Sequence, residues 1–114
     1  MKRPSKYKNR KVTVDGVTYD SAGEYARWCE LKALEKMGAL ERLDRQVRLP
    51  LVIDGAKVGT WIADFRYFQN NRTVFEDYKS RFTAKLPEWR FKEKVIRALY
   101  RNAEIRVHIG GAKR

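Results

Sequence analysis

Two acidic residues near the ends of consecutive predicted strands are the strongest chemical signal in this sequence. Asp64 lies late in the predicted strand 57–68, and Asp77 lies late in the predicted strand 73–79. If the chain reverses at 69–72, antiparallel pairing places residues whose numbers sum to about 141 opposite each other, so Asp64 faces Asp77. Like charges in that position are unfavourable unless a positive group lies between them. The pair therefore predicts a cation site.

Lys79 joins the same predicted site. Residues two apart on a strand share a face, so Lys79 points the same way as Asp77 and Glu76 points the other way. Two carboxylates suit Mg²⁺, which prefers oxygen ligands, lowers the pKa of a bound water and neutralises charge on a phosphate. A lysine can position the attacking water or stabilise the transition state. The set predicts phosphodiester hydrolysis, although Asp64 and Lys79 could instead form an ordinary surface ion pair.

A third carboxylate, Glu24, lies in the first turn of a predicted helix. From there it could complete the site or bind a second metal. The alternative is a capping box, in which Ser21 caps the helix and Glu24 returns the hydrogen bond. The helix is predicted to end at Gly38. Residues at helical spacing form a stripe along it: Ala22, Tyr25, Ala26, Cys29, Ala33, Met37 and Leu40.

The elements that position these residues follow a simple order. A hairpin joins 11–14 to 17–19 through Asp15-Gly16, a dipeptide that tolerates positive φ. After the helix, the pattern predicts strands at 44–53, 57–68, 73–79 and 104–109, a loop at 80–86 and a helix starting at Pro87. Pro50 marks the first of these strands as an edge strand or a bulged one. The predicted class is α+β (mixed α/β), one domain over 11–110, with a basic arm at 1–10 and a basic tail at 111–114.

Composition excludes several classes of protein. One cysteine, Cys29, cannot form an intrachain disulfide, and with one histidine, His108, it cannot build a zinc finger or a zinc-protease site. The sequence has neither a secretory signal peptide nor an apolar run long enough to cross a membrane. We therefore expect a cytoplasmic protein that needs no small-molecule cofactor. Six aromatic residues are expected in the core, with base stacking as the alternative for Trp89: Trp61, Phe65, Tyr67, Phe75, Trp89 and Tyr100.

The charge of the chain predicts a polyanionic partner, most simply nucleic acid. The 114 residues hold 26 Lys and Arg against 14 Asp and Glu, a net charge of +12. The excess lies at the two ends, and the middle of the chain is nearly neutral. Nothing in the sequence resembles a base-reading helix, so we expect phosphate contacts without sequence readout. The predicted DNA-binding residues are Lys6, Lys8, Arg10, Lys11, Arg27, Arg81, Lys85, Arg90 and Lys94.

Four stretches in this order resemble the PD-(D/E)xK nuclease superfamily. They are Val12–Ser21, Glu24–Arg27, Ile62–Phe65 and Val74–Lys79. More narrowly, the chain resembles small phage and prophage endonucleases related to Holliday-junction resolvases. The resemblance spans roughly residues 7 to 107 and implies a restriction-endonuclease-like αβββαβ core.

Carried over by position, the resemblance makes Asp64 and Asp77 metal ligands together with the Tyr78 carbonyl. Lys79 becomes the catalytic lysine and Glu24 the acid from the helix. It further implies Mg²⁺, for which Mn²⁺ would substitute, and a homodimer that cuts branched DNA.

The chain departs from the pattern in three places. Ala63 replaces the proline of the superfamily motif, Asp77 replaces the more frequent glutamate, and Ser80 stands where the narrower family often has glycine. In some relatives a glutamine on the first core strand approaches the site, but an exposed strand residue is the expected reading of Gln46. Two other functions stay open: a non-catalytic nucleic-acid-binding protein, and a repair or restriction-type nuclease that cuts ordinary duplex.

Overall fold

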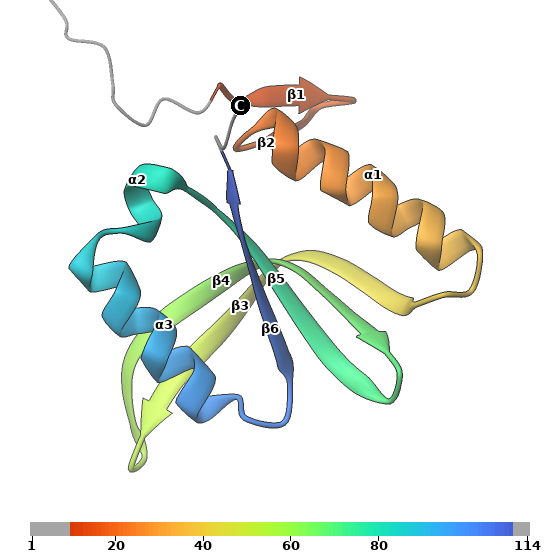
Figure 1. The fold of residues 1–114 in the computed structure, drawn as a ribbon. Coiled ribbons are helices and arrows are strands. Elements are labelled where there is room, and N and C mark those ends of the chain that lie inside the picture. Colours follow the sequence, from red (N-terminus) through yellow and green to blue (C-terminus); the bar gives the residue numbers. More distant parts are fainter. Residues whose placement is uncertain (1–9, 111–114) are drawn as a thin grey trace, which may run out of the picture.

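The computed structural model describes residues 10–110, and its elements follow the predicted order (Figure 1). A short hairpin precedes a long helix, three long strands follow, and two helices lead into the last strand. The elements are β1 (Val12–Val14), β2 (Val17–Tyr19), α1 (Ala22–Lys36), β3 (Glu41–Ile53), β4 (Ala56–Gln69), β5 (Arg72–Ser80), α2 (Arg81–Ala84), α3 (Pro87–Leu99) and β6 (Glu104–Gly110). The predicted mixed α/β fold is confirmed. The arm at 1–9 and the tail at 111–114 lie outside the described residues.

The main sheet has the strand order β3-β4-β5-β6. The first three strands are antiparallel, whereas β6 runs parallel to β5 after the crossover through α2 and α3. The predicted β4–β5 register is confirmed, because every recorded pair from Phe65–Glu76 to Gln69–Arg72 sums to the same value. Pro50 lies within β3, which is an edge strand as its proline indicated.

Three tight turns give the hairpins their direction. Each turn has positive φ at both central residues, the geometry that matches the twist of antiparallel strands. The central pairs are Asp15-Gly16, Asp54-Gly55 and Asn70-Asn71. Asn, Asp and Gly reach this conformation more easily than other residues do, so the sequence fixes these reversals locally.

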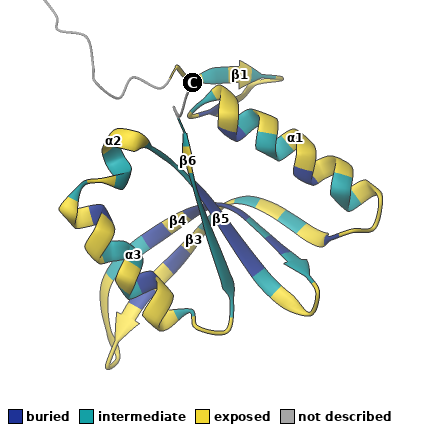
Figure 2. Ribbon diagram, in the orientation of Figure 1, coloured by how far each residue is buried: buried dark blue, intermediate teal, exposed yellow. Residues whose placement is uncertain are grey.

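Two apolar clusters attach the helices to opposite faces of β5 (Figure 2). Phe75 packs with Trp89 and Ile96 of α3, and its neighbour Val74 packs with Leu31 of α1. Adjacent strand residues point to opposite faces, so the two helices lie on opposite sides of this strand. Five of the six aromatic residues expected in the core are buried, and Tyr100 is partly buried.

The strands β3 and β4 form a two-stranded ribbon whose apolar side chains pack against different helices on the two sides of the predicted acidic site. The apolar side chains that this ribbon contributes to the core come from odd-numbered residues throughout. Those on one side of Asp64 join the α1 cluster, and those on the other side join the α3 cluster. Leu43, Phe65 and Tyr67 belong to the first group; Val47, Leu49, Leu51, Trp61 and Ala63 belong to the second. At the same level β4 stops pairing with β5, since the ladder ends at Phe65–Glu76. Asp64 and Asp77 are the next residues, where the strands separate.

One prediction about the elements is wrong. Residues 81–84 form the short helix α2 rather than a loop, because the Ser80 side chain accepts a hydrogen bond from the Thr83 N–H. The predicted helix is present as α1, whose buried residues are Glu24 and Leu31, with Trp28 and Leu34 packed beside them. Within residues 10–110, no helix is long and apolar enough to cross a membrane.

Candidate active site

The predicted acidic pair is present as two buried neighbouring carboxyl groups. Asp64 is 7% exposed and Asp77 is 2% exposed. Burial, together with the charge of Asp77, raises the pKa of Asp64 well above its ordinary value, although a hydrogen bond from the Tyr78 N–H opposes this. The Glu24 carboxylate adds to this rise in the pKa of Asp64. A bound cation would favour the ionised form of Asp64 and so lower its pKa.

Lys79 lies in the position that strand alternation predicted. Its Nζ is 2.6 Å from Oδ2 of Asp77, and its side chain is 20% exposed. The contact is therefore an ion pair between a buried acid and a lysine whose side chain is largely covered, and its acid is Asp77, whereas the alternative was a surface ion pair between Lys79 and Asp64. Glu76 points to the opposite face, as alternation also predicted.

Glu24 reaches the same site from the first turn of α1. Ser21 caps the helix by accepting a hydrogen bond from the Glu24 N–H, so half of the predicted capping box is present. The carboxylate itself turns inward and is 1% exposed. Burial raises the pKa of Glu24, and the nearby Asp20 carboxylate adds to this rise, whereas Arg45 lowers it. Arg45 Nη2 lies 3.5 Å from Glu24 Oε2.

Gln46 contacts two acids of the site, although an exposed strand residue was its expected reading. The residue is exposed as expected, yet its side-chain Nε2 lies 3.2 Å from Asp64 Oδ1 and 3.4 Å from Glu24 Oε2. The residue has a φ of 55° and lies opposite Asp64 in the β3–β4 register. The signal that could have found Gln46 is the resemblance, in which a glutamine on the first core strand approaches the site.

The backbone around Tyr78 completes the immediate surroundings of the pair. Its N–H donates a hydrogen bond to Asp64 Oδ2 at 2.7 Å, which ties the separated end of β4 to β5. The Tyr78 ring stacks on His108, with 4.8 Å between the ring centroids. The role predicted for its carbonyl oxygen stays a prediction.

Two departures from the superfamily pattern have simple structural explanations. Ala63 is fully buried in the α3 cluster. Ser80 has a φ of −69°, which any residue adopts, so a glycine is not needed after Lys79. Instead Ser80 begins α2.

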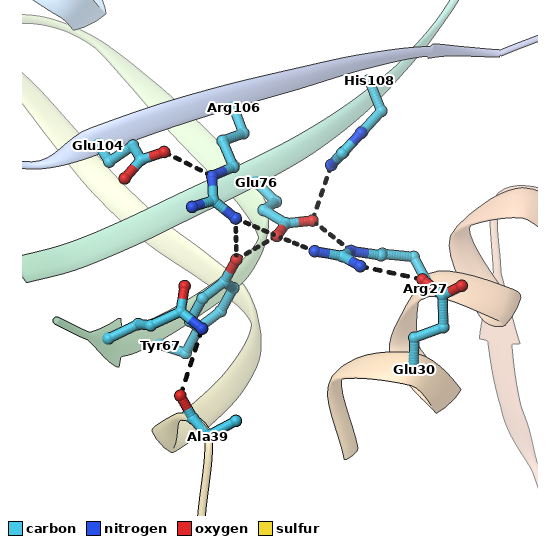
Figure 3. A network of polar contacts seen from close by, with 9 residues as sticks. Arg27, Glu30, Ala39, Tyr67, Glu76, Glu104, Arg106 and His108 are labelled. Carbon is cyan, nitrogen blue, oxygen red and sulfur yellow. Dashed lines mark hydrogen bonds and ion pairs between the residues drawn. The ribbon is translucent and has the colours of Figure 1, made fainter. Parts of the chain in front are cut away.

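Glu76, on the other face of β5, is the centre of a second polar network (Figure 3). Arg27 of α1 makes two hydrogen bonds to it, at 2.9 and 2.8 Å, and Tyr67 donates a third. His108 Nε2 lies 2.8 Å away and Arg106 lies beyond at 3.8 Å. Burial alone would raise the pKa of Glu76, but the hydrogen bonds outweigh it and lower the pKa to about 2. This carboxylate clamps α1 and β6 to β5.

The predicted DNA-binding residues fall into three groups. Lys6 and Lys8 lie outside the described residues. Arg27 is occupied by Glu76 and Glu30, so its guanidinium has a structural role in place of the predicted DNA contact. The remaining residues are exposed: Arg10, Lys11, Arg81, Lys85, Arg90 and Lys94. Lys11 pairs with Asp20 at 3.0 Å.

The exposed basic residues of α2 and α3 adjoin the acidic pair. The helix α2 starts directly after the strand that carries Asp77 and Lys79, and Trp89 in the first turn of α3 contacts Lys79. A polar hollow of about 210 Å³ lies between these elements and the start of α1, lined by Asp20, Ser21, Glu24, Tyr78, Lys79, Ser80, Thr83 and Gly110. An anionic strand held by the helices would therefore pass beside the site.

Comparison with known proteins gives one match. A family model described as "Protein of unknown function (DUF1064)" matches residues 4–113. No curated protein and no solved structure matches significantly. Because the model covers almost the whole chain, this protein belongs to the DUF1064 family.

Proposed function

We propose that this protein is a metal-dependent DNA endonuclease of the PD-(D/E)xK type. The observation that carries the proposal is the buried pair of Asp64 and Asp77, with Lys79 2.6 Å from the second carboxylate. Burying two like charges side by side lowers the stability of the fold unless a cation compensates them. Such an arrangement is typical of functional sites. The net charge of +12 supplies the attraction for a polyanion.

The donor set fits Mg²⁺. Among residues 10–110, no three acidic, histidine or cysteine side chains converge into a preformed metal cage. Mg²⁺ does not require one, because it is commonly bound through one or two carboxylates, several waters and substrate phosphate oxygens. Asp64 and Asp77 would hold the ion, with the Tyr78 carbonyl and Glu24 beside them. When bound, Mg²⁺ supplies charge neutralisation at the phosphate and activation of water, and Mn²⁺ offers the same chemistry.

The other side chains act around that pair. Lys79 presents a cation where charge develops on the phosphate and can orient the attacking water. Gln46 donates one amide to both Asp64 and Glu24, and so fixes their orientation. Glu24 lines the polar hollow at the start of α1 together with Asp20.

Structured DNA is the substrate class that we propose. The exposed cations of α2 and α3 suit phosphate contacts, which carry no sequence information. A homodimer would present two sites to two strands, as branched DNA requires. A reducing cytoplasm is the compartment that we propose for it, since the only cysteine, Cys29, is free.

A cleavage assay on a labelled four-way junction tests the proposal, with Mg²⁺, with Mn²⁺ and with EDTA. Wild-type protein should make paired cuts near the branch with either metal and none in EDTA. Asp77→Ala should abolish cutting while it keeps or tightens junction binding, because it removes a negative charge. Asp44→Ala removes an exposed carboxylate elsewhere on the sheet and should cut like wild type.

Other outcomes assign another function. Tight junction binding without cutting under either metal would indicate a non-catalytic DNA-binding protein. Preferential cutting of the linear duplex arms at equal salt would indicate a repair or restriction-type nuclease. Cutting that survives in Asp77→Ala would contradict the assigned site.

A further inference from the structure

The ammonium group of Lys79 is held between an acid and an aromatic ring. On one side it lies 2.6 Å from Asp77 Oδ2. On the other it lies over the Trp89 ring, 4.2 Å from the centroid. An aromatic face attracts a cation at this distance, and the attraction is stronger where water is excluded. Lys79 is only 20% exposed, so both contacts act in partly desolvated surroundings.

Trp89 is a rigid support for this contact. It is the third residue of α3, which starts at Pro87, and it is 7% exposed. Its ring belongs to the buried cluster with Trp61 and Ile96, which prevents it from changing rotamer freely. A buried ring that faces a lysine is not available to stack on a DNA base, so the alternative suggested for Trp89 from the sequence is not supported.

A second tryptophan acts on the same acid. Trp61 Nε1 lies 3.5 Å from Asp77 Oδ2, the same oxygen that receives Lys79. Both donors therefore use one carboxylate oxygen.

We propose that Trp89 is a positioning residue that holds the Lys79 ammonium against Asp77. A lysine side chain has four rotatable bonds and would otherwise sample many orientations. The ring restricts it to one direction while leaving its charge in place. The contact itself depends only on the fold, whereas its consequence for cleavage rests on the proposed nuclease function.

The contact can be tested in the wild-type protein without any activity. The ring current of Trp89 should shift the Lys79 Hε signals upfield of those of the exposed Lys94 in a ¹H–¹³C spectrum. Loss of a signal in Lys79→Arg assigns it. Lys79 Hε signals at the position of Lys94 would overturn the proposal, whether or not the protein cuts DNA.

The consequence is tested with Trp89→Leu and Trp89→Phe on the four-way junction. Trp89→Leu should lower kcat by about tenfold with little change in the KM for DNA, since the lysine is misplaced but binding is not. Trp89→Phe keeps an aromatic face and should recover most of kcat. The control Ile96→Ala removes packing from the same helix and cluster without touching Lys79, and should leave kcat unchanged in the folded fraction.

The results separate the two proposals. Equal losses of kcat in Trp89→Leu, Trp89→Phe and Ile96→Ala would overturn the positioning role, because packing alone would then explain them. If Trp89→Leu does not fold, the positioning role is tested by the Lys79 signals of the wild type and by the kcat of Trp89→Phe. Upfield Lys79 signals in a protein that cuts nothing would support the contact and count against the nuclease function alone.

Discussion

At the scale of single residues, the site concentrates acidic groups that the fold does not need for stability. Asp64, Asp77 and Glu24 are all buried, and the pKa values of Asp64 and Glu24 are raised mainly by that burial. Stability is often lost where function requires buried charge. Substitutions of these acids should therefore change both the cleavage rate and the free energy of unfolding.

Asp64→Asn should stabilise the protein at neutral pH when EDTA is present. The raised pKa of Asp64 means that wild-type stability falls as pH rises above the ordinary value of 3.8, since the unfolded chain then releases a proton that the folded state still holds. The variant has no such penalty, so its advantage should grow with pH and reach at least about 1 kcal/mol by pH 7. Urea unfolding measures it. Mg²⁺ should stabilise the wild type but not the variant; equal stabilisation of both would contradict a metal at Asp64.

Gln46→Ala should lower the cleavage rate by about 10- to 100-fold, the usual cost of losing a residue that orients metal ligands. The amide holds Asp64 and Glu24 in place but would not touch the phosphate directly. Single-turnover rates on the junction measure the effect. Gln69→Ala is the matched control, since Gln69 bonds to the Ala39 carbonyl at the far end of β4. Comparable rates in the two variants would remove Gln46 from the site.

At the scale of elements, α1 is attached to β5 by a charged pair as well as by apolar packing. Arg27 and Glu76 join the two elements, and Glu76 is fully buried. The helix end is equally well defined. Gly38 N–H donates to the Glu35 carbonyl and Ala39 N–H to the Leu34 carbonyl, which is a Schellman motif with glycine at φ 79°.

Arg27→Met should lower the free energy of unfolding by about 3 kcal/mol, because it leaves a buried carboxylate without its main partner. Urea denaturation measures the loss. Glu30→Ala removes the exposed partner of the same arginine and should cost less than about 1 kcal/mol. Adding Glu76→Gln to Arg27→Met should restore part of the stability, and a further loss in the double variant would argue against this pairing.

Gly38→Ala should cost about 1 kcal/mol of stability, since an L-residue is strained at this positive φ. No heavy atom lies within 4 Å of the added Cβ, so the cost is conformational rather than steric. Gly59→Ala serves as the comparison. Its Cβ would lie 3.7 Å from Leu51 Cδ1, an ordinary contact, and thermal unfolding should show no loss for it. An unchanged melting temperature for Gly38→Ala would show that the helix end is not held in this conformation.

At the scale of the whole molecule, the basic helices lie next to the candidate active site. The basic helices α2 and α3 follow the strand that carries Asp77 and Lys79, whereas the end of α1 lies on the other side of the sheet (Figure 1). Phosphate binding by such a surface releases counterions and therefore weakens as salt increases.

Lys85→Ala and Lys94→Ala should each weaken binding to junction and to duplex by similar factors. Each should reduce the slope of log affinity against log salt by about 1, as expected for one lost phosphate contact. Fluorescence anisotropy at several salt concentrations measures both. Lys36→Ala, in the last turn of α1, should change neither quantity. A full slope change for Lys36→Ala would place the DNA on another face.

The sequence by itself determined the features that depend on local chemistry. Turn dipeptides with positive φ set the hairpins, the reversal at 69–72 set the β4–β5 register, and that register predicted Asp64 opposite Asp77, just beyond the last recorded pair. Lys79 followed from alternation. These inferences hold because each depends on neighbours in the chain or on one antiparallel pairing.

Only the tertiary structure decided which faces meet. The inner face of α1 carries Glu24 and Arg27, because buried partners on β3 and β5 compensate their charges, and no periodicity of apolar residues shows this. Gln46 entered the site through an irregular backbone opposite Asp64. Trp89 reached Lys79 because α3 packs against the sheet. Contacts between distant segments depend on packing and on burial of charge, which the order of residues does not encode locally.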